Sequence, residues 1–277
     1  MSGTEAQSFG VIAGNGPLPG IVLKNLKAEG FSVYVAAHVG ETPENTLLLA
    51  DDVCWVKPGA LGTLLAFFRA HNVQQALFAG GLKKAALLRT FEPDKEAIEF
   101  IETLPNLHDD TILRSLAAWL ENQGVNILDT RIGIGGLLGP EGVLTKLSPS
   151  PKHQKDIALG FQAARALGGL DVGQAVVTED LIVLALEAIE GTDAMIQRAG
   201  AFSKGDGVLV KAKKPSQDSR FDLPSVGPAT IANMAKAGLK VLAFEAGWTV
   251  LFEQERLVSE ADALGMVVVG VGANDGI

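Results

Sequence analysis

The sequence lacks the residues on which several classes of protein site depend. Cys54 is the only cysteine among 277 residues, so the chain can form neither an intramolecular disulfide nor a thiolate cage for a metal ion. The four histidines, at positions 38, 71, 108 and 153, are widely separated and lack the His-x3–5-His spacing of many zinc sites. If the protein binds a metal ion, we therefore expect a hard cation held by carboxylates.

Long apolar runs and basic blocks are also missing. No run of 18 apolar residues occurs, so we expect no membrane-spanning helix. Residues 1–7 carry no positive region followed by an apolar stretch, and we expect a cytoplasmic protein. The formal net charge is −9, and no block of five basic residues is present. Binding to nucleic acid needs clustered Lys and Arg, so we expect no nucleic-acid partner, whereas a small anionic substrate needs only a few placed lysines and a metal ion.

Short apolar runs alternate with helical patterns through the first half of the chain. The strands are expected at 9–13, 31–37, 75–79 and 125–128, and the helices at 20–29, 61–70 and 111–122. This alternation favours a parallel, doubly wound sheet, and the fold class is α/β with a Rossmann-like N-terminal domain. A length of 277 residues fits one large or two modest domains.

A segment rich in glycine separates two halves of the chain that differ in their pattern of strands and helices. Residues 133–142 contain five glycines and one proline, and we interpret them as a linker or hinge between domains spanning 1–132 and 143–277. A long surface loop is the alternative. The second half is expected to form a mixed-sheet α/β domain with a hairpin at 174–177 and 181–186, a helix at 194–199 capped by Thr192 or Asp193, strands at 208–212, 241–244 and 266–271, and helices at 229–237 and 259–264.

The turn Gly14-Asn15-Gly16 lies between the first expected strand and helix. It approaches the dinucleotide fingerprint Gly-x-Gly-x-x-Gly, but the third glycine, Gly20, comes one position late. No Asp or Glu ends the second strand to hold a ribose, and His38 stands there instead. The amides of such a turn can hold a phosphate or a nucleoside. A purely structural turn and a nucleotide-dependent oxidoreductase are the alternatives.

A second glycine turn, Gly80-Gly81, follows the third expected strand and precedes Lys83 and Lys84. Ligands of open α/β sheets bind at the carboxyl ends of the strands, and both glycine turns are expected at that edge. Two glycines permit a backbone nest for an anion, and lysines would favour its charge. We therefore take Gly80, Gly81 and Lys83 as phosphate-binding candidates, with solvated surface lysines as the alternative.

Charged residues are densest between 211 and 222. This stretch contains Lys211, Lys213, Lys214, Asp218, Arg220 and Asp222, next to an apolar strand. Cations of this kind can neutralise phosphates, and carboxylates can hold a metal ion or orient water. A second acidic cluster consists of Glu187, Glu190 and Asp193. Either cluster alone could be a solvated loop, but both together in one domain favour a site.

Several motifs, taken in order, resemble the UDP-2,3-diacylglucosamine pyrophosphatases of the LpxI type, which act in lipid A biosynthesis. The most specific are the run Glu-Gly-Thr-Asp at 190–193 and Gln-Asp-x-Arg-x-Asp-x-Pro at 217–224. The others are Ile-Ala-Gly-Asn-Gly-Pro-Leu-Pro at 12–19, Phe-Ala-Gly-Gly at 78–81, Asp-Asp at 109–110 and Leu-Asp-Val-Gly-Gln-Ala-Val-Val at 170–177. One departure is Lys84-Ala85, where a basic residue followed by proline is expected.

The resemblance implies Mg²⁺-dependent hydrolysis of UDP-2,3-diacylglucosamine to 2,3-diacylglucosamine 1-phosphate (lipid X) and UMP. It also implies that this glycolipid nucleotide lies between two domains, and that the protein makes transient peripheral contact with the cytoplasmic face of the inner membrane. A homo-oligomer is left open. A non-catalytic nucleotide or lipid sensor is a further alternative to the enzyme.

Roles follow for the candidate residues within this chemistry. Asp222 is expected to be the essential carboxylate, either as a Mg²⁺ ligand or as the base for water, with Asp218 second. The other metal-ligand candidates are Asp193 and Glu190. The phosphate-binding candidates are Lys211, Lys213, Lys214, Arg220, Gly80, Gly81 and Lys83, and the substrate-contact candidates are Gly14, Asn15, Gly16, Gly191 and Thr192.

Overall fold

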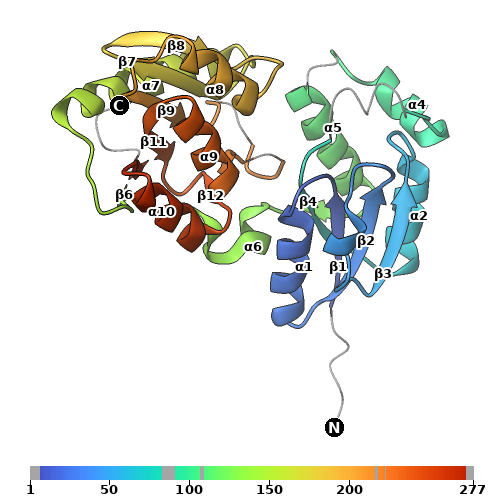
Figure 1. The fold of residues 1–277 in the computed structure, drawn as a ribbon. Helices are drawn as coiled ribbons and strands as arrows, with labels where there is room; N and C mark the ends of the chain where they lie inside the picture. Colours follow the sequence, from blue (N-terminus) through green and yellow to red (C-terminus); the bar gives the residue numbers. More distant parts are fainter. Residues whose placement is uncertain (1–6, 83–90, 107–108, 216–217, 222, 273–277) are drawn as a thin grey trace. The chain divides into compact units, whose positions relative to one another are not determined.

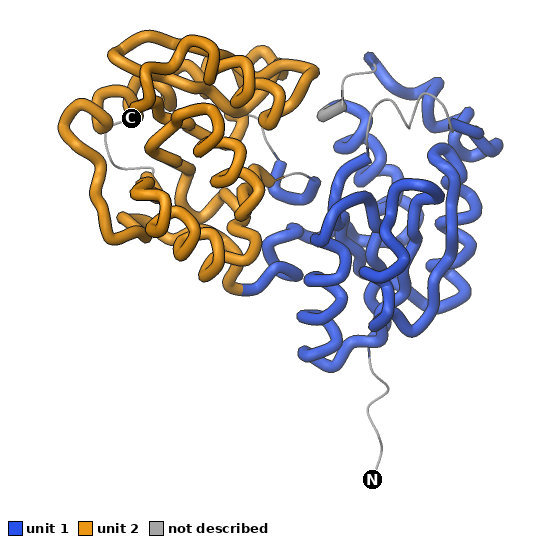
Figure 2. The backbone as a smooth tube through the Cα atoms, viewed as in Figure 1, with its two compact units in different colours: residues 1–135, 218–222 blue, residues 136–217, 223–277 orange. Residues whose placement is uncertain are grey.

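A computed structural model describes residues 7–82, 91–106, 109–215, 218–221 and 223–272 (Figure 1). The chain forms two compact units, coloured separately in Figure 2. Unit 1 comprises Met1–Gly135 and Asp218–Asp222, and unit 2 comprises Gly136–Gln217 and Leu223–Ile277. Within the described part of the chain, no helix is both long and apolar enough to cross a membrane.

The sheet of unit 1 is fully parallel, as the sequence predicts. Its strands are β1 (Ser8–Ala13), β2 (Ser32–His38), β3 (Asp52–Val56), β4 (Gln75–Ala79) and β5 (Asn126–Ile127). They follow the order β3-β2-β1-β4-β5, and every neighbouring pair is parallel. This is a doubly wound order, in which the chain runs outward from β1 in both directions and the strand order reverses between β1 and β4. The edge strand β3 was not predicted.

Helices cover both faces of this sheet. They are α1 (Leu18–Ala28), α2 (Leu61–Ala70), α4 (Lys95–Glu102), α5 (Asp109–Asn122) and α6 (Arg131–Ile134), with a 3-10 turn, η1 (Glu44–Thr46). Helices α2 and α5 bury Phe68 and Leu120 on one face, against Ile12 and Phe78 of the sheet. On the other face, Gly133 of α6 lies between side chains of α1 and β4, where a Cβ would collide with them.

The sheet of unit 2 is mixed, again as predicted. Its strands are β6 (Gly142–Val143), β7 (Ala175–Glu179), β8 (Ile182–Leu186), β9 (Gly207–Lys211), β11 (Leu239–Glu245) and β13 (Val267–Val271). The order is β6-β13-β11-β9-β7-β8. Strands β9, β11 and β13 are parallel, whereas β6 and β7 pair antiparallel with their neighbours. The predicted hairpin is β7–β8, and it turns at Asp180 and Leu181, both of which have positive φ. A further parallel pair joins β10 (Ser225–Val226) and β12 (Val250–Leu251).

Four helices sandwich this mixed sheet. Helix α7 (Pro151–Gly169) packs on one face, and α8 (Thr192–Gly200), α9 (Pro228–Lys236) and α10 (Gln254–Ala263) pack on the other. The 19-residue helix α7 was not predicted. The N-cap of α8 is Gly191, so the prediction of Thr192 or Asp193 as its cap is wrong. Gly191 has φ 80°, a value that glycine adopts most easily, and the Thr192 hydroxyl bonds elsewhere.

The segment 133–142 carries more structure than a plain linker. It contains the end of α6, the 3-10 turn η2 (Gly135–Leu137) and the start of β6, and the two units divide between Gly135 and Gly136. A second difference concerns Asp218–Asp222. The predicted boundary puts them in the C-terminal domain, whereas the described residues 218–221 group with unit 1.

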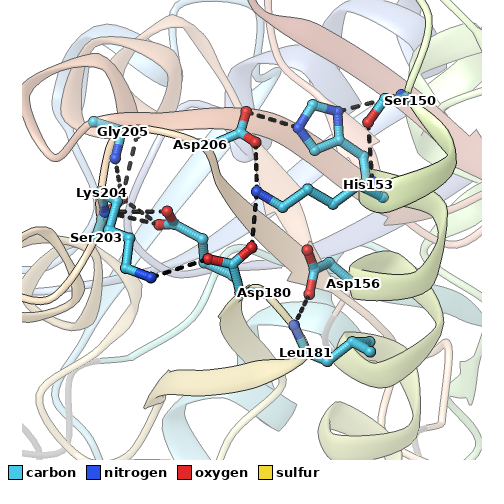
Figure 3. A network of polar contacts seen from close by, with 12 residues as sticks. Ser150, His153, Asp156, Asp180, Leu181, Ser203, Lys204, Gly205 and Asp206 are labelled. Atoms are coloured by element: carbon cyan, nitrogen blue, oxygen red, sulfur yellow. Dashed lines mark hydrogen bonds and ion pairs between the residues drawn. The ribbon is translucent and has the colours of Figure 1, made fainter.

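A polar network at the start of α7 fixes this helix to two loops of unit 2 (Figure 3). Lys152 Nζ lies 2.9 Å from both Asp180 and Asp206, and His153 Nε2 lies 2.8 Å from Asp206. His153 Nδ1 accepts the Ser150 amide within the helix cap, so Nε2 must carry the hydrogen that Asp206 accepts. Hydrogen bonds from Lys152 hold the pKa of Asp180 below its usual range. The contribution of Asp180 to stability is therefore present at neutral pH and is lost as the pH falls through that lowered pKa.

Candidate functional site

The two glycine turns of unit 1 meet at the carboxyl ends of β1 and β4. The Gly14 amide donates to Ala79 O and the Asn15 amide donates to Gly81 O, each at 2.8 Å. A Cβ on Gly14 would overlap Gly81 O, and a Cβ on Gly80 would overlap Asn15 O. Glycine is thus required at both positions because the two backbones touch. The structure brings together five of the predicted residues, Gly14, Asn15, Gly16, Gly80 and Gly81.

This meeting point lies where the strand order reverses, the position at which doubly wound sheets bind ligands. Gly16 has φ 81°, and neither Gly16 nor Gly81 has a described atom within 4 Å of the place of a Cβ. Helix α1 begins two residues after Gly16, and because Pro17 and Pro19 have no amide hydrogen, its first amides at this edge are those of Leu18 and Gly20. Such amides and the positive end of a helix dipole suit a phosphate. Lys83 of the same turn lies outside the described residues.

Polar side chains surround the end of β1 on its β2 side. Ala13 O accepts the Thr42 hydroxyl at 2.7 Å and His38 Nδ1 at 2.9 Å. Because a carbonyl oxygen only accepts, Nδ1 carries the hydrogen of the neutral ring. Burial lowers the pKa of His38, although the bond to Ala13 and the charge of Glu41 oppose it. The ring is therefore neutral at pH 7, with Nε2 as an acceptor.

Glu41 is a residue of this edge that the sequence analysis missed. Its Oε2 accepts Nδ2 of Asn15, from the glycine turn, at 3.2 Å. The pattern of the dinucleotide fingerprint expects a carboxylate at the last residue of the second strand, whereas Glu41 lies three residues further, in the turn after β2. An acidic residue within a few positions of the strand end is the signal that indicates it.

Asp218 and Arg220 engage each other in this structure. Arg220 Nε lies 3.0 Å from Asp218 Oδ1 and its Nη2 lies 2.8 Å from Asp218 Oδ2, a bidentate pair. Arg220 Nη1 also donates to Glu121 at 3.1 Å. The hydrogen bonds from Arg220 lower the pKa of Asp218, although partial burial opposes them. These bonds use part of the hydrogen-bonding capacity of both side chains, and the predicted roles in metal binding and phosphate binding stay predictions.

The segment 218–221 is fixed to unit 1 at the end of β4. The Ser219 hydroxyl donates to Asp129, which Arg131 also holds through two nitrogens. The buried Thr130 hydroxyl lies between the carbonyl oxygens of Phe78 (3.0 Å) and Arg220 (2.9 Å). The ring of Phe221 packs edge-on against Phe78, which precedes Gly80 by two residues. This loop from the second half of the sequence therefore completes the edge that carries the glycine turns.

Asp222, the strongest sequence candidate, lies outside the described residues. Its predicted role as essential carboxylate stays a prediction. The same holds for the placement of the substrate between the two domains.

Unit 2 carries a buried chain of polar groups at the end of β9. Lys211 is only 8% exposed, and its Nζ donates to the Thr192 hydroxyl at 3.1 Å and to Ser225 O at 3.0 Å. The Thr192 hydroxyl in turn donates to Glu187 at 2.5 Å. Two predicted residues, Lys211 and Thr192, are thus brought together. Glu187, predicted only as a member of the acidic cluster, joins them.

The other charged candidates of unit 2 have separate partners. Lys213 Nζ lies 3.7 Å from the centre of the Trp248 ring, and Lys214 pairs with Asp171 at 2.6 Å. Glu190 pairs with Arg198, and Asp193 accepts Asn233. Among the residues that the structure describes, no group of three or more His, Cys, Asp or Glu side chains is arranged to hold a metal ion. The metal-ligand roles of Asp193, Glu190 and Asp218 stay predictions.

A surface groove of about 640 Å³ lies elsewhere in unit 2. Its lining includes Leu144, Lys146, Val258 and Asp262, and none of the predicted site residues. Two carboxylates, Glu255 and Asp262, and one ammonium, Lys146, line it, which gives no excess of positive charge for a phosphate. The chemistry of the chain therefore points to the strand ends and not to this groove.

Comparisons with known proteins agree with the motifs. The model of the LpxI N-terminal domain matches residues 8–137, and that of the LpxI C-terminal domain matches residues 140–269. A curated relative, UDP-2,3-diacylglucosamine pyrophosphatase LpxI of Caulobacter vibrioides, is 34% identical over 96% of this chain and 98% of its own length. A solved structure of a biotin carboxylase complex from Campylobacter jejuni covers 71% of this chain and 42% of its own, with 12% identity. Its TM-score of 0.24 is too low to carry an argument.

The contact between the glycine turns predicts a difference between two neighbouring substitutions. Gly80→Ala adds a methyl group against Asn15 O at a position with φ 81°, so we expect a loss of about 2–4 kcal/mol in the free energy of unfolding. In Gly81→Ala the added methyl group has no described atom within 4 Å, so the free energy of unfolding should change by less than about 1 kcal/mol. Urea unfolding of both variants measures the difference, and equal losses would contradict the close approach of the turns.

Proposed function

The chain belongs to the LpxI family, and from that membership we propose that it hydrolyses the pyrophosphate of UDP-2,3-diacylglucosamine in lipid A biosynthesis. The products would be 2,3-diacylglucosamine 1-phosphate and UMP. The observation that carries the proposal is the similarity along nearly the whole chain, with both domains of the family matched in order. A hydrolase acting on a pyrophosphate bond needs groups that bind phosphate, and each unit supplies candidates.

Hydrolysis adds water to one phosphorus and breaks its bond to the bridging oxygen. Negative charge grows on the leaving phosphate, so amides or cations must face it. In unit 1, the candidates for this task are the amides of Gly16, Leu18 and Gly20, because Gly14 and Asn15 already donate to backbone carbonyls and Pro17 and Pro19 have no amide hydrogen. In unit 2, Lys211 offers an ammonium that Thr192 and Ser225 hold in place. The Glu187–Thr192 hydrogen bond keeps that hydroxyl aligned as an acceptor for Lys211.

We further propose that Mg²⁺ supports the reaction by neutralising phosphate oxygens. Magnesium is commonly bound by one or two carboxylates together with substrate phosphates. The described residues hold no preformed ligand set, so the ion would need the diphosphate itself and a carboxylate such as Asp222. In an assay of UDP-2,3-diacylglucosamine hydrolysis, a chelator should abolish the activity and added Mg²⁺ should restore it.

The two acyl chains of the substrate suggest transient contact with the inner-membrane surface at its cytoplasmic face. Exposed apolar side chains support this proposal: Ile189 is 94% exposed and Leu170 is 76% exposed. They lie on two turns of unit 2 that approach each other, since a Cβ on Gly173 would overlap the backbone of Glu187. Contact through these turns would bury apolar area in the lipid.

Vesicle binding tests the membrane proposal. Ile189→Ser with Leu170→Ser should lower the fraction of protein that floats with vesicles of inner-membrane lipids. The matched variant Leu48→Ser, which removes a side chain 83% exposed in unit 1, should leave flotation unchanged. Equal flotation of all three proteins would remove these turns from membrane contact.

Asp222 gives the direct test of the proposed chemistry. If it ligates Mg²⁺ or orients water, Asp222→Asn should lower turnover of UDP-2,3-diacylglucosamine by about 10²–10⁴-fold, because the charge and basicity are lost while the shape is kept. Substrate binding should persist, since the other phosphate-binding groups are unchanged.

Asp180→Asn is the control for this test, because it removes a carboxylate of the network at the start of α7. It should change the melting temperature and leave turnover of the folded protein near normal. A folded Asp222→Asn variant with near-normal turnover would exclude Asp222 from the mechanism.

A further inference from the structure

The turn after β2 holds Glu41 rigidly beside the glycine turn of β1. The amides of Glu41 and Thr42 both donate to His38 O, at 3.1 and 3.0 Å. The Thr42 hydroxyl accepts the His38 amide at 3.0 Å, and Thr42 is only 6% exposed. The side chain of Glu41 then accepts Asn15 Nδ2. The turn thus positions the backbone of Glu41, and Asn15 positions its carboxylate.

The groups gathered here are mainly hydrogen-bond acceptors. A carboxylate has about four lone-pair positions, and the bond from Asn15 takes one of those of Glu41. When Nδ2 of Asn15 donates to Glu41, its Oδ1 is an acceptor as well. His38 donates through Nδ1 to Ala13 O, which makes Nε2 the acceptor of the neutral ring. Hydroxyl groups are the ligand chemistry that pairs with such a set.

These acceptors lie next to the glycine turn, where the ribose of a bound nucleotide is expected. When phosphates lie on the first βα turn of a doubly wound sheet, the ribose of the same nucleotide extends toward the end of β2, where a carboxylate accepts its hydroxyls. In this chain that place is taken by Glu41, which is bonded to Asn15 within the glycine turn. Phosphate donors and ribose acceptors are thus adjacent in unit 1.

We infer that Glu41, with Asn15 and His38 beside it, binds the ribose hydroxyls of the uridine in the substrate and makes unit 1 the part that recognises the nucleoside. This inference rests on the proposed function for the identity of the nucleotide. It assigns Glu41 to specificity and leaves the chemistry of the pyrophosphate to other residues.

Deoxy analogues of the substrate test the inference in the full-length protein. The wild-type protein should lose about 10–100-fold in kcat/KM on the 2′-deoxy or the 3′-deoxy uridine analogue, the effect of one hydrogen bond to a charged group. Glu41→Ala should lose a similar factor on the normal substrate and should then treat normal and deoxy substrates nearly alike. Glu41→Gln keeps an acceptor for Asn15, and its kcat/KM on the normal substrate should lie between those of the wild-type protein and Glu41→Ala.

Glu44→Ala is the matched control, because Glu44 is exposed on the same segment. It should discriminate between normal and deoxy substrates as the wild-type protein does. Full discrimination by a folded Glu41→Ala variant, or none by the wild-type protein, would overturn the inference while leaving the activity intact.

Calorimetry with UMP and its deoxy forms separates this inference from the proposed function. Tighter binding of UMP that depends on Glu41, in a protein that never hydrolyses the glycolipid, would support the ribose site and refute the activity. Equal binding of UMP and both deoxy forms by the wild-type protein would refute the ribose site.

Discussion

The backbone contact between two glycine turns is the constraint on which the candidate site of unit 1 depends. Gly14 and Gly80 have no side chains, so β1 and β4 can end within hydrogen-bond distance of each other's following turn. Two side-chain contacts lie beside this backbone contact. Asn15 reaches Glu41 on one side, and Phe221 packs on Phe78 on the other. A side chain at either glycine would separate the turns and displace both groups.

The parts of the fold that could be predicted are those whose pattern is local. Strands such as β4 are continuous apolar runs, and α2 was predicted with its observed bounds because its apolar spacing is helical. Helix α7 was missed because its glycines lower helix propensity, yet Gly160 lets the helix pack closely on Val210. Strand β3 was missed because it is half exposed, with Asp52 at its start.

The candidate site could be predicted in its residue types but only partly in its partners. The sequence shows a dense group of charges between 211 and 222, but nothing in their spacing says that Arg220 pairs with Asp218 or that Lys214 pairs with Asp171. Lys214 and Asp171 are 43 residues apart and meet only through tertiary packing, whereas Arg220 and Asp218 are two residues apart and pair because of the local turn. The return of 218–221 to unit 1 through Ser219 and Asp129 also depends on tertiary packing.

If the nucleotide binds where the glycine turns of unit 1 meet, its phosphates should protect the backbone amides of that edge. Hydrogen exchange of the full-length protein with and without UMP measures this protection. We expect slower exchange in the amides of 14–21 and 80–82, and smaller changes in the surface groove lined by Leu144 and Val258. Slower exchange in unit 2 alone at saturating UMP would contradict binding at the glycine turns.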